Sequence, residues 1–127
     1  MKIGSTVNLI VQCDSGFDIT SVDSIIFTLQ TNFKSISKEY KADGSGIVNF
    51  DSENYYFVIP VYQKDTIELS NGEAMLCQVE GQINYTDNSV KKTSIDAVRM
   101  VATLSTSLIT DNAPSDNQKE LLNITIY

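Results

Sequence analysis

The chain has 127 residues, with 9 Lys and Arg against 16 Asp and Glu, so that its formal charge is −7. A chain of this length fits one domain with its own hydrophobic core. It has no histidine, which removes the usual general base and the commonest transition-metal ligand. The acidic balance argues against a nucleic-acid partner, because phosphate binding needs clustered Lys and Arg. We therefore expect a soluble domain that is not an enzyme and carries no metal ion or cofactor.

The N-terminal segment lacks the pattern of a signal peptide. Such a peptide needs an apolar run of roughly 7–15 residues after its basic start, whereas residues 4–8 are mostly polar. The longest apolar stretch, residues 55–62, is far shorter than the ~20 residues that span a bilayer. The sequence therefore predicts a protein that is made in a cytoplasm, is not exported by a signal and has no membrane segment.

Apolar and polar residues alternate along the first half of the chain, a pattern that predicts β-strands. In chain order, these strands cover residues 7–13, 24–31, 36–40, 47–50 and 55–62. Turn-forming segments separate them, most clearly residues 14–18 and 41–46. Pro60 places the last of these strands at a sheet edge, at a bulge or at a strand end.

The second half of the chain contains the clearest hairpin. Residues 64–69 are compatible with one turn of helix, and Asn71-Gly72 marks a tight turn after it. Two long strands then cover residues 73–85 and 90–104, with a bulge near residues 95–97 where the alternation slips. Seven or eight strands with a turn about every ten residues predict an all-β fold, an Ig-like antiparallel β-sandwich.

The composition changes at Ser105, after which the chain is polar until about residue 119. We expect a sandwich domain over residues 1–109, followed by a linker and a C-terminal strand or arm over residues 110–127. The last eight residues are apolar and rich in β-branched side chains. Either this strand returns to its own sheet, or it adds to a neighbouring subunit by strand addition.

The two cysteines, Cys13 and Cys77, form no Cys-x-x-Cys pair, so nothing indicates a zinc site or a redox motif. Without a histidine to activate it, Cys77 is not expected to be a nucleophile. Two interpretations stay open: the cysteines are reduced, buried small residues, or they form a disulfide between two sheets.

Acidic side chains recur in two short segments. Residues 14–23 contain three aspartates, and Asn49, Asp51 and Glu53 occupy every second position. Neither segment has the spacing of a calcium-binding EF-hand loop. We interpret them as solvated turn acids, because Asp and Asn favour turns, and a weak cation site is the alternative.

Two apolar segments are candidate interfaces with other proteins: the aromatic run in the middle of the chain and the C-terminal strand. The candidate interface residues are Tyr55, Tyr56, Phe57, Leu121, Leu122, Ile124 and Ile126. As an alternative, the aromatic run lines a sugar-binding surface, since aromatic platforms serve that kind of recognition. No arrangement of residues predicts a catalytic site.

Residues 72–104 carry a distinctive hairpin pattern, in which one strand turns through Asp-Asn-Ser into a second long strand. The residues that define it are Gln78, Val79, Ile83, Tyr85, Asp87 and Ser89. The pattern resembles small Ig-like proteins and domains of bacteriophage particles, such as the N-terminal domain of baseplate upper proteins. Asn88 stands where that family usually has Gly, and Asn still permits the positive φ of such a turn. The resemblance covers about residues 5–109.

The resemblance implies a non-enzymatic structural protein of a bacteriophage virion, in the tail, the baseplate or another part of the particle surface. Its partners would be other virion proteins, and the chain would be a homo-oligomer or bound to a lattice. It would be made in the host bacterial cytoplasm and located in the virion. Two alternatives stay open: a β-sandwich module that binds carbohydrate or the host surface, and a capsid decoration or head-fibre protein.

Overall fold

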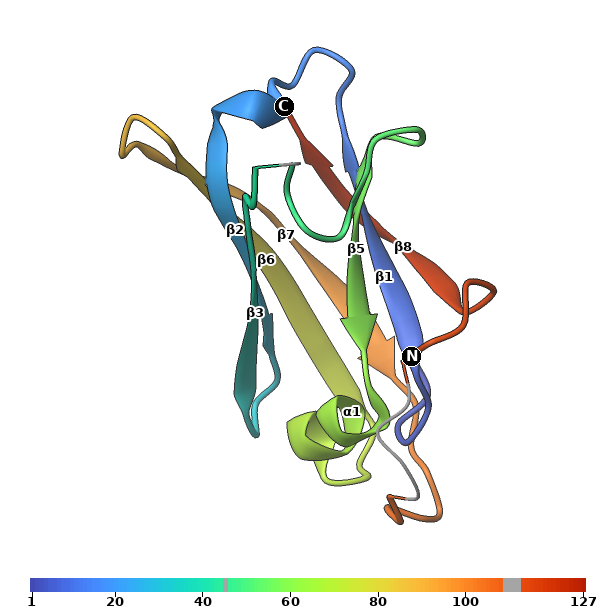
Figure 1. Ribbon diagram of the computed structural model, residues 1–127. Coiled ribbons are helices and arrows are strands. Elements are labelled where there is room, and N and C mark those ends of the chain that lie inside the picture. The colour runs from blue at the N-terminus through green and yellow to red at the C-terminus, as the bar shows by residue number, and fades with distance from the viewer. Residues whose placement is uncertain (45, 109–112) are drawn as a thin grey trace.

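The computed structural model describes residues 1–44, 46–108 and 113–127, and within them eight strands form two facing four-stranded sheets (Figure 1). The strands are β1 (Val7–Cys13), β2 (Val22–Gln30), β3 (Ser35–Lys41), β4 (Phe50–Asp51), β5 (Tyr56–Val61), β6 (Met75–Tyr85), β7 (Val90–Met100) and β8 (Lys119–Ile126). The helical elements are the 3₁₀ turn η1 (Ile19–Ser21) and the helix α1 (Gln63–Ser70). The predicted all-β sandwich is therefore confirmed.

The first sheet has the strand order β4-β5-β1-β8, and it contains the C-terminal strand. β5 is antiparallel to β1, whereas β8 is parallel to it, with Asn8 opposite Lys119 and Cys13 opposite Ile126. The interpretation in which the C-terminal strand returns to its own sheet is thus confirmed, and its addition to a neighbouring subunit is not what the structure shows. The side chains of β8 that face inward belong to the core of the sandwich.

The second sheet has the order β3-β2-β6-β7 and is antiparallel throughout. The predicted hairpin is β6–β7, and its turn places Asn88 at a φ of 70°. The register shifts between the pairs Glu80–Ile95 and Gln82–Lys92, so the extra residue of the bulge lies at residues 93–94. The predicted position at residues 95–97 is therefore wrong by a few residues.

Gly81 fixes the position of this bulge. Its N–H donates to Thr93 Oγ1 at 2.9 Å. A Cβ at residue 81 would lie 3.0 Å from Thr93 Cγ2 and 3.1 Å from Phe27 Cε1. Only glycine leaves room for both Thr93 of the bulge and the aromatic ring, so the bulge in β7 lies opposite the residue that has no side chain.

The core fills the space between the two sheets with alternate residues of every long strand. Phe27 from the second sheet meets Phe57 from the first with their ring centroids 5.9 Å apart. Both side chains are completely buried, as are Leu9, Ile59 and Leu29. Burying side chains of this size stabilises the fold by roughly 1.5–3 kcal/mol each.

α1 covers one end of the sandwich (Figure 1). Leu69 of this helix is buried in the core, and the backbone N–H of Tyr62 donates to Asp65 Oδ2 at 2.9 Å to cap the first turn. Asn71 ends the helix in the left-handed conformation, with φ of 52°. None of the helices in the described ranges is long and apolar enough to cross a membrane.

Candidate interaction surface

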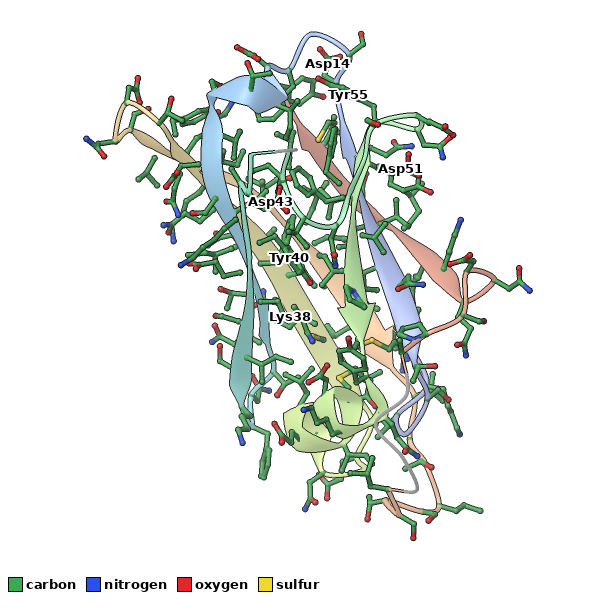
Figure 2. All side chains as sticks on the ribbon, viewed as in Figure 1. Asp14, Lys38, Tyr40, Asp43, Asp51 and Tyr55 are labelled. Atoms are coloured by element: carbon green, nitrogen blue, oxygen red, sulfur yellow. The ribbon has the colours of Figure 1, made fainter. Side chains whose placement is uncertain are left out.

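The loops opposite α1 are rich in acidic side chains, three of which are labelled in Figure 2 (Asp14, Asp43 and Asp51). Four of these acids accept backbone N–H groups of their own turns. The pairs are Asp14 with Gly16 at 3.0 Å, Asp18 with Thr20 at 3.1 Å, Asp51 with Glu53 at 3.0 Å and Asp87 with Ser89 at 2.9 Å. These carboxylates thus build turns, in agreement with the turn interpretation.

Hydrogen bonding changes the acidity of two of these groups. The backbone N–H of Asn54, and then its side-chain amide, hold the pKa of Asp51 below its ordinary value of 3.8. The Ser89 hydroxyl, and then its N–H, lower the pKa of Asp87 in the same way. In the part of the chain that the structure describes, no three His, Cys, Asp or Glu side chains form a group that could hold a metal ion.

The two cysteines do not pair. Both are free thiols, Cys77 buried and Cys13 half-buried, so the disulfide alternative is wrong for this structure. Burial raises the pKa of Cys77 to about 11 and that of Cys13 to about 12. Thiols with such pKa values carry almost no thiolate near neutral pH and are poor nucleophiles.

Four of the candidate interface residues are part of the core, which corrects the sequence-based interpretation. Phe57, Leu122, Ile124 and Ile126 all have buried side chains. In β5 and β8 they occupy the inward positions of alternating strands, and the second sheet covers them. They are therefore not available to a partner while the sandwich is folded.

The two tyrosines of the aromatic run are half-buried and have partners within the chain. The Tyr55 hydroxyl donates to the carbonyl of Phe17, and its ring packs against Phe50 with centroids 5.1 Å apart. The Tyr56 side chain is half-buried, and its hydroxyl contributes to the lowered pKa of Asp51. The run therefore does not present three exposed rings of the kind that a sugar-binding platform needs.

The β5 edge of the first sheet carries a feature that hinders strand addition. β4 pairs only with Tyr56 and Phe57, so further along β5 is itself the edge among the described strands. Cys13 N–H donates to the Tyr55 carbonyl, so these two residues form a hydrogen-bonded pair. Because hydrogen-bonded and non-hydrogen-bonded pairs alternate along antiparallel strands, the pair of Asn8 with Pro60 is not hydrogen-bonded, and the Pro60 nitrogen points away from β1. Pro60 thus offers no donor to an added strand, as its predicted edge position requires.

A surface of regular structure with many exposed side chains lies on the outward side of the second sheet, over β2, β6 and β7. We call its central part the outer face; it comprises Gln30, Leu76, Gln78, Ile95, Ala97 and Arg99. Leu76 is 59% exposed and Ile95 is 57% exposed. The pairing of Leu76 with Arg99, Gln78 with Ala97 and Glu80 with Ile95 makes Leu76 a diagonal neighbour of Ala97, and Ile95 follows Ala97 on the same side of β7.

A hollow of about 380 Å³ opens at the α1 end of the outer face. Its walls include Gln30, Asn32, Met75, Leu76, Gln78 and Ala97. A larger hollow of about 500 Å³ lies at the other end of the sandwich, but two of its apolar residues, Val22 and Ile47, are buried in the core. Of these two hollows, only the one on the outer face is bordered by a strongly exposed aliphatic side chain, that of Leu76.

Leu121, the remaining candidate interface residue, is 61% exposed and lies on the outward side of the first sheet. It stands beside Ile10, whose side chain is nearly covered. Of the seven candidate interface residues, Leu121 alone is mostly exposed. The sequence-based prediction did not include Leu76, Ile95 or Ala97. The signal that could have found them is that they are apolar residues at positions of β6 and β7 whose alternation with buried residues predicts an outward, polar side chain.

The chain matches no protein-family model, no curated protein and no solved structure. A functional proposal therefore rests on the hairpin pattern in the sequence and on the surfaces described above.

Proposed function

We propose that the protein is a non-enzymatic structural protein of a bacteriophage virion, which docks on neighbouring virion proteins through the outer face. The observation that carries the proposal is the β6–β7 hairpin. Its sequence pattern resembles the Ig-like phage proteins, and its outward side presents Leu76, Ala97 and Ile95. Leu76 pairs with Arg99 and Ile95 pairs with Glu80. The core of a protein interface is more apolar than the rest of the surface and is enriched in Arg, so aliphatic side chains beside an arginine suit such a core.

The mode of docking follows from the strand edges and faces. The C-terminal strand is committed to β1, and Pro60 leaves the β5 edge without a donor, so strand addition to the first sheet has little support. Packing of a partner on the open sheet face needs no rearrangement of the sandwich. A tail, baseplate or capsid-surface position is equally compatible with such a face.

Mass spectrometry of purified particles encoded by the same genome tests the proposal. We expect the chain in the particles, in many copies per particle. The double variant Leu76→Asp/Ile95→Asp should fold but be lost from them, because two buried carboxylates in an interface are costly. Leu121→Asp is the matched control, with similar exposure on the opposite face, and should still be incorporated.

Two results would contradict the proposal. The first is absence of the parent chain from purified particles, and the second is equal incorporation of the double variant and the control. Binding of the purified chain to a glycan array, lost in Tyr56→Ala, would instead favour the carbohydrate-binding alternative. Cross-linking of intact particles would name the neighbouring protein and thereby separate a tail position from a capsid decoration.

A further inference from the structure

Acids and bases are nearly balanced on the outward side of the second sheet, to which the outer face belongs. The chain carries a formal charge of −7, and acidic loops crowd the end opposite α1. On the second sheet, Lys92 Nζ lies 3.3 Å from Glu80 and Lys41 Nζ lies 3.3 Å from Glu39, and Arg99 adds a cation. Two copies of an acidic chain repel each other, and that repulsion is weakest where acids and bases balance.

The same face carries both a projection and a hollow. Ile95 projects from β7. The hollow beside Leu76 and Ala97 begins about two residues further along the strands, towards α1. In an isologous contact, each surface meets itself after a half-turn, so that a projection on one copy meets a hollow on the other. A face that holds both is therefore suited to a second copy of itself.

We propose that the occupant of the outer face is a second copy of this chain, packed face to face about a two-fold axis that lies across the strands near Gln78 and Ala97. This inference rests on the docking role proposed above and names its partner. The half-turn reverses the strand direction and lays β7 over β7, so Ile95 of each copy comes over Arg99 of the other, one strand away from Leu76. Arg99 of one copy thereby comes within one strand of Glu80 of the other, an opposite-charge pair.

The size of the face sets the strength of the contact. Strands lie ~4.8 Å apart and rise ~3.4 Å per residue, so the outward side of the whole second sheet, β3 included, covers roughly 450 Å² on each copy if each of its four strands contributes about seven residues. Stable protein interfaces bury about 1,200–2,000 Å² in total, and weak or transient ones bury less. The face is thus large enough for a weak dimer, whose population depends on concentration and which a repeated lattice would reinforce.

Sedimentation equilibrium of the full chain, at concentrations from about 1 μM to about 1 mM, tests the inference over the affinity range of weak interfaces. We expect the average mass to rise towards twice the monomer mass. Ile95→Asp should weaken the association at least tenfold, and Arg99→Glu should weaken it as well. Glu80→Arg combined with Arg99→Glu should restore it in part, which a purely structural effect of either change would not do.

Leu121→Asp is again the control and should leave the association unchanged. Oxidation of Ala97→Cys should give a disulfide-linked dimer, since residues beside a two-fold axis meet their own copy, whereas Ser37→Cys and the parent chain should not cross-link. A monomer at every concentration, or loss of association in Leu121→Asp but not in Ile95→Asp, overturns the inference. Because a monomeric chain can still enter particles through a different partner, particle incorporation separates this failure from failure of the proposed function.

Discussion

Lys38 and Asp65 join the edge strand β3 to the first turn of α1, with Lys38 Nζ 2.8 Å from Asp65 Oδ2. The ammonium also lies 4.8 Å from the centre of the Tyr62 ring. Their side chains are only 16% and 9% exposed, and Figure 2 shows Lys38 on β3 close to α1. The pair fixes the helix cap, and it puts a charge on the inner side of an edge strand, which hinders pairing with another chain.

Lys38→Met should destabilise the sandwich by roughly 2–3 kcal/mol, because it leaves the carboxylate of Asp65 buried without its cation. Urea unfolding followed by circular dichroism measures this loss. Lys41→Met is the matched control on the same strand, since its pair with Glu39 is exposed and such pairs contribute about 0–1 kcal/mol. Equal losses in the two variants would show that the buried pair has no special role.

Gly81→Ala should also destabilise the fold, by roughly 1–3 kcal/mol, because the added methyl group meets Phe27 and Thr93 at about 3 Å. Urea unfolding measures the loss. Combination with Thr93→Ser removes the Thr93 methyl group, one of the two groups that the added methyl group meets, and should recover part of the stability. Gln78→Ala on the outward side of the same strand is the control. Failure of the Ser variant to recover any stability would indicate that Phe27 alone sets the cost.

Most of the strands could be predicted from the sequence because a half-buried strand alternates with period two. The hairpin β6–β7 is the clearest case, and its inward positions, such as Val79 and Ile83, are buried as expected. The position of the bulge could not be predicted, because it depends on the contact between Gly81 and Phe27 of another strand. Such a contact has no signature in the local alternation.

The interface residues were harder to predict for a related reason. An apolar strand at the end of the chain, such as β8, has the same pattern whether it pairs with its own sheet or with a neighbour. The pairing of β8 with β1 spans more than 100 residues of sequence, and it buries Leu122, Ile124 and Ile126. Conversely, Leu76 and Ile95 are single apolar residues among polar ones, and only the sheet register places them with Ala97 on one face.

Leu121 and Leu122 are adjacent but face opposite sides of β8, so the same change should affect them very differently. Leu122→Ala should cost roughly 2–5 kcal/mol, since it leaves a cavity in the core. Leu121→Ala should stay within about 0.5 kcal/mol, because its side chain is mostly exposed. Thermal or urea unfolding of both variants distinguishes them. Similar small effects would mean that β8 does not dock on the core in solution.

Asp51 and Asp87 should make the turns sensitive to acid. Their pKa values are lower in the folded chain than their ordinary value of 3.8. Their contribution to stability is therefore present above pH 3.8 and is lost as the pH falls through the lower, folded pKa. Carboxyl-carbon NMR should give lower titration midpoints in buffer than in urea. The variant Asp51→Asn/Asp87→Asn should lose less stability than the parent below pH 4, and an identical pH profile would contradict this account.

The two thiols should report on the integrity of the sandwich. With pKa values of about 11 for Cys77 and about 12 for Cys13, against an ordinary 9.0, the thiolate population at pH 8 is reduced by roughly a hundredfold or more. Alkylation by iodoacetamide should therefore be slower by at least that factor in buffer than in urea, with mass spectrometry of peptides assigning each site. Fast labelling of Cys13 alone would show that the end of β1 opens locally, while fast labelling of Cys77 would be incompatible with its burial between the sheets.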